Sequence, residues 1–548
     1  MTRAILPLSV LMLLIGCSTD RSRIERAVRS ISVRSIERYV AELASDRFMG
    51  RKPFTEGEEI TISYLADQLR KIKFGPAFDG SYFQKVPMAE ITSHVDEILF
   101  SKPSGTTLRF RTPDEAAVIS PLESGHITAV DLPLVFAGFG INAPEYGWND
   151  YSGLDVRGKM VIVLVNDPGL YTGDSALFRG REMTYYGRWT YKYEEAARQG
   201  AAAVLIIHDT EGAGYEYNIP RKSSISPRLY IQGHGQNNPL CDFTGWLPGD
   251  SADRLLKACS LSTDSLRAEA CKQGFRGFPL NINASVSCRN EIRYDESSNV
   301  AGILKGSRNP DECIVFTAHW DHFGIGESEN GDSIYNGAVD NATAMAWALA
   351  AGKAFSSLGK RPERSIVLLF PTAEEAGLLG SLYYTEHPVI AMENTAACLN
   401  NDLMLPIGRM KDVMITGYGQ SELDDIASRL AEKQGRYVAG DPNPHTGMYF
   451  RSDHFAFAKK GVPSLYARGS IESLKYGKEW AAEQEEDYIR NRYHRPSDNY
   501  EAGKWDFGGI AEDAGLAFSI AFELSFAGVW PGWKESSEFR NLSPRRNR

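Results

Sequence analysis

Cysteine, basic charge and long apolar runs are all scarce in this sequence of 548 residues. Its 7 cysteines include no C-x-x-C pair, which argues against a structural zinc knuckle. Its formal net charge of -10 offers no basic face for nucleic acid to bind. The apolar run at residues 4–16 is too short to span a bilayer as a helix. No internal repeat or low-complexity tract is present, so the length indicates a globular protein with several structural units.

The N-terminal segment has the pattern of an export signal. Arg3 precedes the apolar run, and Cys17 follows it directly. The Leu-Ile-Gly-Cys ending resembles a bacterial lipobox, in which the cysteine is lipidated and becomes the mature N-terminus. A plain secretory signal with a chance cysteine is the alternative. Because Ser18 is not an acidic retention signal, we expect a lipid anchor in the cell envelope at the outer membrane, with residues 1–17 as signal peptide and residues 18–30 as tether.

Four of the other cysteines follow one another closely in the sequence: Cys241, Cys259, Cys271 and Cys288. In an exported protein they can be oxidised, and they allow three pairings between which the sequence does not choose. Cys313 and Cys398 lie in apolar strand patterns, and we predict that they are core residues.

The order of the predicted elements indicates a discontinuous α/β domain. Apolar residues recur at helical spacing through residues 60–72, which predicts an amphipathic helix that needs a sheet to cover. Strand–loop–helix units from about residue 297 to 527 supply such a sheet. We therefore predict that residues 31–105 and 293–530 form one α/β domain, a mixed central sheet flanked by helices, and that residues 531–548 are a tail.

Residues 106–292 are predicted to be a β-rich module inserted into that domain. Short strands joined by glycine turns begin near Leu132, and a helix that ends at Gly200 leads into a buried strand. Residues 125–231 resemble a protease-associated (PA) domain. The cysteine-bearing stretch at residues 237–289 resembles no known module, and we interpret it as an insertion.

Residues able to bind a divalent ion stand at the ends of apolar strand patterns. Such patterns end at His319, Glu375 and Asp402, and a Gly/Asn-rich turn that opens a helix contains Asp340. In an open α/β sheet, ligands collect at the C-terminal ends of the strands. Together with His494, far downstream, these residues offer nitrogen and oxygen donors, which suit zinc or a similar ion. Five ligands are too many for one tetrahedral zinc, but they suit two zincs that share a carboxylate.

Two further carboxylates are candidates for catalysis. Glu374 adjoins Glu375, and because adjacent side chains diverge, one can bind a metal while the other accepts a proton from water and passes it to the leaving amine. Asp321 can hold the imidazole of His319 by a hydrogen bond, or act on the site through its charge. The Glu pair alone would suit a solvated helix N-terminus, but the apolar run before it argues for a buried site.

The motifs H-W-D, G-A-V-D-N-A, E-E-A-G-L-L-G-S, N-N-D-L-M and Y-H-R-P-S-D resemble those of the co-catalytic dizinc aminopeptidases, relatives of aminopeptidase Y and glutamate carboxypeptidase. The resemblance covers nearly the whole mature chain, the PA-like segment included. It implies Glu374 as general base and Asp321 as a residue that orients or tunes the site. It also implies ligands for two Zn²⁺ ions: His319 and Asp402 for one, Glu375 and His494 for the other, and Asp340 between them.

The resemblance implies a zinc-dependent aminopeptidase that acts on peptides. A carboxypeptidase or dipeptidase of the same fold is the first alternative, and it would need Arg451 or Arg468 to bind a substrate carboxylate. A one-zinc enzyme similar to glutaminyl cyclase and a non-catalytic, receptor-like binding protein are the others, although no expected ligand or base is missing. Tyr493 is either a donor to the tetrahedral oxyanion or a packing aromatic. The sequence does not reveal which substrate side chains are preferred, which metal is native, the oligomeric state or the role of the PA-like segment.

Overall fold

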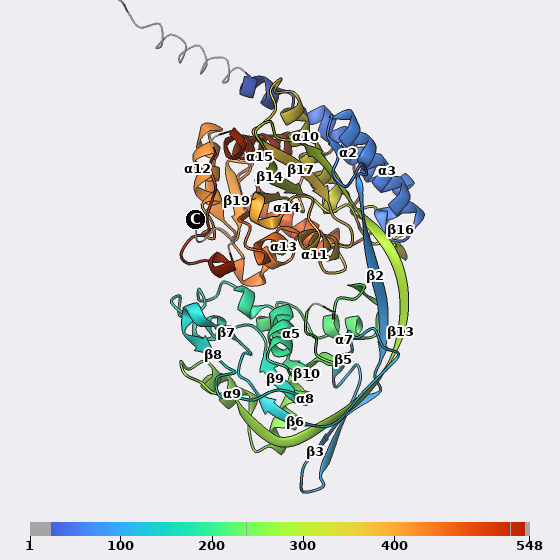
Figure 1. Cartoon of the computed structure of the whole chain (residues 1–548), viewed down its shortest axis with the longest axis vertical. Coiled ribbons are helices and arrows are strands. Elements are labelled where there is room, and N and C mark those ends of the chain that lie inside the picture. Colours follow the sequence, from blue (N-terminus) through green and yellow to red (C-terminus); the bar gives the residue numbers. More distant parts are fainter. Residues whose placement is uncertain (1–22, 237, 527, 543–548) are drawn as a thin grey trace, which may run out of the picture. The chain divides into compact units, whose positions relative to one another are not determined.

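A computed structural model describes residues 23–236, 238–526 and 528–542 (Figure 1). The predicted signal peptide and lipidated Cys17 lie outside the described residues. Within the described part, the chain divides into two compact units. Unit 1 draws on the described residues of 23–86, 297–441 and 451–542, and unit 2 on those of 87–296 and 442–450. The predicted first boundary, after residue 105, falls inside unit 2.

Unit 1 is built on a mixed sheet. Its strands are β1 (Gly75–Pro76), β13 (Phe278–Leu304), β17 (Arg364–Phe370), β14 (Asn309–Thr317), β18 (Thr395–Asn400), β21 (Ser464–Arg468), β19 (Asp412–Thr416) and β20 (Tyr437–Gly440), in that spatial order. Strands β17, β14, β18 and β21 are parallel, whereas β13 and β19 run antiparallel to their neighbours β17 and β21. Only residues 297–304 of β13 belong to this unit. The predicted mixed α/β fold is confirmed.

Helices cover both faces of this sheet (Figure 1). On one face the core includes helices α2 (Val33–Leu43), α3 (Glu56–Lys71), α10 (Thr343–Ser356), α12 (Leu423–Lys433) and α15 (Gly508–Phe526). On the other face it includes α11 (Leu379–Glu386) and α13 (His454–Lys459). Phe316 and Leu368 join the first core, whereas their neighbours Val315 and Leu369 join the second. Successive strand residues therefore point to opposite, equally buried faces, which explains the continuous apolar runs in the sequence. The predicted amphipathic helix is confirmed as α3.

Unit 2 is rich in strands. Their order is β4 (Thr107–Arg111), β3 (Glu97–Ser101), β13, β6 (His126–Phe136), β9 (Met160–Leu164), β10 (Ala203–Ile207), β12 (Phe243–Leu247) and β5 (Ala117–Ile119). A further pair joins β2 (Phe83–His94) to β11 (Arg228–Ile231). The helix predicted to end at Gly200 is α5 (Trp189–Arg198), which leads through Gly200, at φ 84°, into β10.

The remaining helices of unit 2 include α8 (Gly249–Ala258) and α9 (Thr263–Ala270), which lie in the stretch interpreted as an insertion. All six cysteines of the described chain are free thiols. Among the described residues, no helix combines the length and the apolar character needed to cross a membrane.

Candidate metal centre

The predicted ligands stand where parallel strands of unit 1 end. His319 follows β14, Glu374 and Glu375 follow β17, and Asp402 follows β18. Because β14 lies between β17 and β18 and is parallel to both, the three strand ends meet at one edge of the sheet. Asp340 joins them from the turn that precedes α10.

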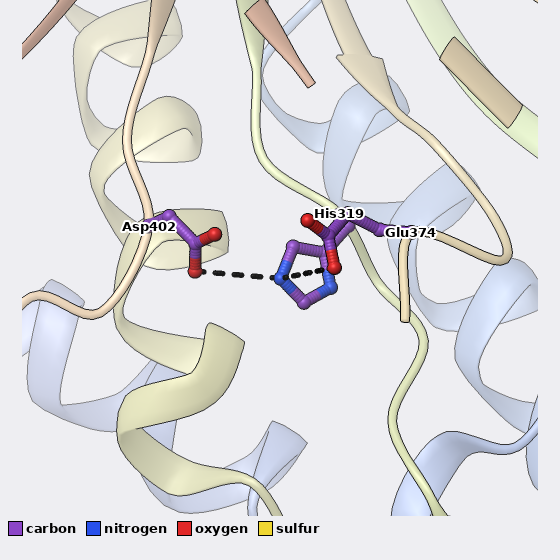
Figure 2. A group of neighbouring side chains, drawn as sticks. All are labelled: His319, Glu374 and Asp402. Carbon is purple, nitrogen blue, oxygen red and sulfur yellow. Dashed lines mark ion pairs between the residues drawn. The ribbon is translucent and has the colours of Figure 1, made fainter. Parts of the chain in front are cut away.

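His319 is the centre of a first group of donor atoms (Figure 2). Its Nε2 lies 3.3 Å from Asp340 Oδ1, 3.4 Å from Asp402 Oδ1 and 3.8 Å from Glu374 Oε2. All four side chains are at most 10% exposed. Neither His319 Nε2 nor Asp402 Oδ1 makes a hydrogen bond within the described chain. Because buried polar atoms without partners cost free energy, the gap between these two atoms suits a cation.

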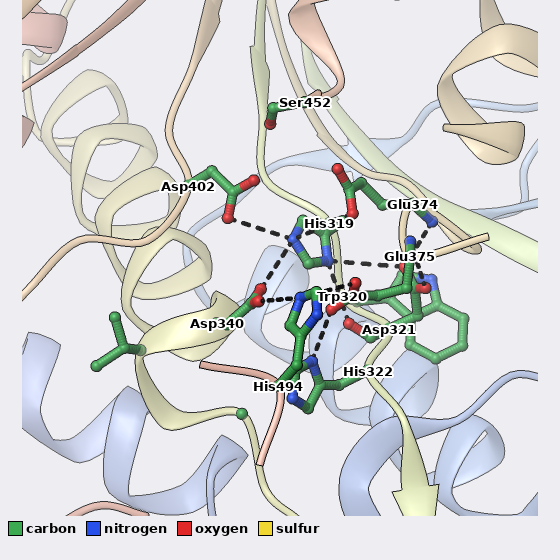
Figure 3. Close-up of polar contacts among 12 residues, drawn as sticks. His319, Trp320, Asp321, His322, Asp340, Glu374, Glu375, Asp402, Ser452 and His494 are labelled. Atoms are coloured by element: carbon green, nitrogen blue, oxygen red, sulfur yellow. Dashed lines mark hydrogen bonds and ion pairs between the residues drawn. The ribbon is translucent and has the colours of Figure 1, made fainter. Parts of the chain in front are cut away.

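His494 and Glu375 form a second group with Asp340 (Figure 3). His494, which follows α14 (Gly477–Asn491), places its Nε2 3.3 Å from Asp340 Oδ2 and 3.2 Å from Glu375 Oε2. Asp340 therefore turns Oδ1 toward His319 and Oδ2 toward His494. This is the arrangement required of a carboxylate that contacts two ions.

The spacing of these atoms fits zinc. Donors bound to one tetrahedral zinc at about 2.0–2.2 Å lie about 3.4 Å from one another. The imidazole-to-carboxylate distances at Asp340, Asp402 and Glu375, between 3.2 and 3.4 Å, match this value. The distance of 3.8 Å between His319 Nε2 and Glu374 Oε2 exceeds it. The distances therefore match the zinc spacing at five residues, whereas Glu374, which shares one group of possible ligands with His319 and Asp402, lies somewhat farther from the imidazole.

Asp321 holds the backbone of the Glu374–Glu375 pair. Its carboxylate oxygens accept the main-chain N–H groups of Glu374 at 3.0 Å and of Glu375 at 3.3 Å. His319 Nδ1 lies 3.1 Å from the main-chain oxygen of Asp321 but 3.7 Å from its carboxylate. The predicted hydrogen bond between the two side chains is therefore made to the main chain instead. Asp321 still orients the site, because it fixes the loop after β17 to the loop after β14.

Three non-glycine residues with positive φ lie at or beside the candidate ligands. Ala373, at φ 50°, precedes Glu374; Leu403, at φ 52°, follows Asp402; and His494 itself has φ 57°. The left-handed region is unfavourable for residues with a Cβ atom, and proteins retain such residues mainly where they place functional groups.

Arg51 is a residue of the site that sequence analysis missed. It is fully buried, and its guanidinium donates hydrogen bonds to the main-chain oxygens of Leu43, Trp320, Asn336, Gly337 and Asp340. Two of these segments carry His319 and Asp340, so Arg51 ties them together. Burial lowers the pKa of Arg51 to about 10, although nearby carboxylates oppose this shift, and the group stays charged at neutral pH. In the sequence, nothing distinguishes Arg51 from any basic residue of a Gly/Pro loop.

His322 was missed as well. Its side chain is completely buried, and its Nδ1 lies 2.8 Å from Glu375 Oε1 (Figure 3). Donor atoms of His322, Asp340 and Glu375 lie within 4.8 Å of one another, as do those of His319, Glu374 and Asp402. The spacing H-x-D-H, which continues the predicted His319–Asp321 motif by one residue, is the signal that could have revealed it.

Charge interactions set the protonation of the cation-free site. Burial lowers the pKa of His494, but Glu375 and Asp340 outweigh it and raise the pKa to about 10. Burial raises the pKa of Glu374 well above its ordinary value despite the neighbouring His319. At neutral pH without a cation, His494 is therefore charged. A metal ion requires the neutral imidazole, so its binding must displace the proton of His494.

The remaining predicted residues are placed as follows. Tyr493 stacks on His494 with ring centroids 3.7 Å apart, as a packing aromatic would. Arg468 is buried, lies over the Tyr466 ring at 5.1 Å and faces Glu485 at 3.8 Å.

This chain resembles known proteins in sequence and in fold. Residues 299–518 match the model of Peptidase family M28. Over 131 residues the chain is 34% identical to Aminopeptidase NAALADL1 of Mus musculus, covering 23% of this chain and 16% of that protein. Over 256 residues it is 23% identical to Carboxypeptidase Q of Xenopus laevis, covering 46% of this chain and 44% of that protein. The matches therefore span less than half of either relative. A solved structure, the aminopeptidase from Aneurinibacillus sp. strain AM-1, aligns with 92% of this chain and 96% of its own at 17% identity and a TM-score of 0.46.

Proposed function

We propose that this chain, whose residues 299–518 belong to peptidase family M28, is a zinc-dependent exopeptidase that removes N-terminal residues from peptides. The observation that carries the proposal is Asp340, a buried carboxylate that turns one oxygen toward each of two imidazoles. The residues assigned to two zinc ions are His319 and Asp402 for one, His494 and Glu375 for the other, and Asp340 for both.

Glu374 is the proposed general base and acid. Zinc bound at these ligands would polarise the scissile carbonyl and lower the pKa of water. Glu374 lies near His319 but too far from it to share a tetrahedral ion, so its carboxylate remains available to take a proton from the attacking water and deliver it to the leaving amine. The hydrogen bond from the Glu374 N–H to Asp321 fixes the backbone from which this side chain projects.

Two observations favour an aminopeptidase over a carboxypeptidase. The relative with 34% identity to this chain is named an aminopeptidase. Arg468, which a carboxypeptidase could use to bind a substrate carboxylate, already faces Glu485 and the Tyr466 ring. The carboxypeptidase stays the second candidate, because another relative is named Carboxypeptidase Q.

Metal content and end-blocked peptides test this function. The purified chain should contain about two zinc ions per molecule and should cleave peptides with a free N-terminus, whether or not the C-terminus is amidated. Acetylation of the N-terminus should abolish cleavage. Cleavage only of N-acetylated peptides with a free carboxylate would replace the aminopeptidase by a carboxypeptidase, and a protein that takes up no divalent ion would refute both.

We further propose that unit 2 is a PA-type module. Its β-rich composition and the α5–Gly200–β10 unit support this assignment. An experimental structure of residues 87–296 with a different strand order would refute it.

We also propose that the chain is exported and anchored in the outer membrane by a lipid at Cys17. The support is the sequence alone, an apolar run that ends directly before Cys17. In a bacterial host, the wild-type chain should sediment with outer membranes, and Cys17→Ala should release it from the membrane fraction. Membrane retention of the variant would refute the anchor.

A further inference from the structure

We propose that His322 is a positioning residue that makes Glu375 bind its metal ion through one oxygen only. The inference rests on the proposed function, because it assumes that Glu375 is a metal ligand. It concerns His322, which is not one of the five assigned ligands, and the number of oxygens through which Glu375 binds its ion.

The distance between His322 and Glu375 identifies a hydrogen bond. Two ligands of one tetrahedral zinc would be about 3.4 Å apart. His322 Nδ1 and Glu375 Oε1 are 2.8 Å apart, which is shorter than that spacing and typical of an N–H···O hydrogen bond. Because an ionised carboxylate can only accept, Nδ1 carries the proton and donates it. His322 therefore contacts the ligand and leaves the ion to others.

The two oxygens of Glu375 have different partners. Oε1 accepts from His322 at 2.8 Å, and Oε2 lies 3.2 Å from His494 Nε2, at the spacing expected for two ligands of one zinc. Binding through both oxygens would require Oε1 to leave His322. The hydrogen bond therefore keeps Oε2 as the single ligand atom and leaves one more coordination position of that ion open.

His322 is itself held firmly. Its main-chain N–H donates to the main-chain oxygen of Arg51 at 3.2 Å, and the Phe323 ring contacts its imidazole at a centroid distance of 4.9 Å. Of its two ring nitrogens, Nδ1 contacts Glu375, whereas the buried Nε2 has no hydrogen-bond partner among the described residues. Outer contacts of this kind orient metal ligands, and their loss typically costs about 10–100-fold in metal affinity.

At the other ion position, the described residues show a different outer contact: His319 Nδ1 lies 3.1 Å from the Asp321 main-chain oxygen, and Asp402 Oδ1, which faces His319 at 3.4 Å, has no hydrogen-bond partner. Removing the His322 imidazole should therefore weaken the ion at Glu375 and His494 and spare the ion at His319 and Asp402. This asymmetry separates a positioning role from general damage to the site.

Zinc titration of the metal-free full-length chain by calorimetry tests the inference without an activity assay. The wild type should bind two ions. His322→Ala should weaken one of them about 10–100-fold and leave the other within about threefold of wild type. His322→Asn should keep both near wild type, because the asparagine side-chain amide can occupy the place of Nδ1 and donate the same hydrogen bond. The exposed His387→Ala is the matched control and should change neither affinity.

Several results of these zinc titrations would contradict the inference. Wild-type affinity for both ions in His322→Ala would overturn it, and so would a loss in His322→Asn equal to that in His322→Ala, since the ring itself would then be a ligand. If circular dichroism shows that His322→Ala does not fold, His322→Gln replaces it. The glutamine amide lies farther from the backbone than Nδ1 does, so His322→Gln should lose the ion that His322→Asn retains. Zinc retained by His322→Gln and lost by His322→Asn would refute the proposal. A wild type that binds no zinc would refute the proposed function and this inference together, whereas two ions with equal affinities in all variants would refute this inference alone.

Discussion

Both units of the chain bury a cluster of charged side chains, and the clusters differ in how the charges are balanced. In unit 2, Lys192 is fully buried, its Nζ donates a hydrogen bond to the main-chain oxygen of Tyr186, and the charges of Asp167 and Asp150 act on it. Burial lowers the pKa of Lys192 to about 7, against the attraction of both carboxylates. In unit 1, by contrast, five carboxylates gather around His319, His322, His494 and Arg51: Asp321, Asp340, Glu374, Glu375 and Asp402.

Hydrogen bonding separates the two clusters further. Asp150 accepts from two main-chain N–H groups at 3.0 Å and from the Trp148 indole at 2.9 Å, and Asp167 accepts from Gly169 and Thr184. In unit 1, atoms of His319 and Asp402 that face each other have no hydrogen-bond partner among the described residues. A cluster whose polar atoms are all paired is complete without a ligand. A cluster that has polar atoms without hydrogen-bond partners and an excess of carboxylates can be completed by cations. Hydrogen-bond pairing and charge balance therefore distinguish a structural cluster from a candidate metal centre.

The largest expected effect tests whether the unit 1 cluster performs chemistry. Glu374→Gln should reduce kcat about 10²–10⁴-fold, because the amide cannot accept the proton of the attacking water. Zinc content should stay at the wild-type level, since Glu374 lies outside the ligand spacing. Peptide hydrolysis and metal analysis of the same sample measure both. An unchanged kcat would remove Glu374 from the mechanism, and lost zinc would make it a ligand.

The second prediction tests whether the unit 2 cluster is purely structural. Lys192→Met leaves Asp150 and Asp167 without their cation and should lower the free energy of unfolding by about 3–5 kcal/mol, as measured in urea. The zinc content of the folded protein should not change. Lys222→Met, at an exposed position of α7 (Asn218–Ser224), is the control and should alter stability by less than about 0.5 kcal/mol. A loss of zinc in Lys192→Met would mean that the two clusters are coupled and would break the comparison.

The unit 1 fold and the convergence of its candidate ligands could be predicted because both depend on local patterns. Apolar runs such as β14 and β17 are buried on both faces, and a parallel strand order brings their ends together whatever the loops do. Ligands at those ends, such as His319, therefore meet as a consequence of the fold. Their ability to bind a metal follows from the residue type alone, because imidazole and carboxylate groups are common metal ligands.

The contributions of Arg51 and His322 could not be predicted, because they depend on long-range packing. Arg51 contacts main-chain oxygens nearly three hundred positions away in the sequence, at Gly337 and Asp340. Main-chain acceptors leave no residue-type signal at the partner position, so no motif reveals such contacts. His322 meets Glu375 only because two loops from neighbouring strands converge.

The third prediction tests whether Arg51 acts by charge or by geometry. Arg51→Lys keeps the positive charge but cannot donate five hydrogen bonds in the guanidinium arrangement, so buried main-chain oxygens lose their partners. We expect the free energy of unfolding to fall by about 2 kcal/mol and kcat to fall with it, because Arg51 joins the segments of His319 and Asp340. Arg47→Lys, an exposed arginine of the same loop paired with Glu42, should have little effect. Equal stability of Arg51→Lys and wild type would show that charge alone suffices.

The last prediction concerns pH, and it also separates a metal centre from a structural cluster. In the metal-free site the pKa of His494 is about 10, above its ordinary value of 6.5, so the imidazole holds a proton between these limits. Zinc must displace that proton, and its affinity should therefore rise by up to about tenfold for each pH unit from about 7 toward 10 as His494 releases it. Burial lowers the pKa of His319, but Glu374 and Asp402 raise it well above its ordinary value, so this imidazole should add to the proton release. Calorimetric titrations at pH 8 in buffers of different ionisation enthalpy count the released protons directly.

Glu375 should contribute no proton to this count. Burial raises its pKa, but His494 and His322 lower it to about 2, so the carboxylate is already ionised. An affinity that does not change with pH would mean that His494 is neutral before the metal binds, and the negative charge of the unit 1 cluster would then have to be balanced in another way.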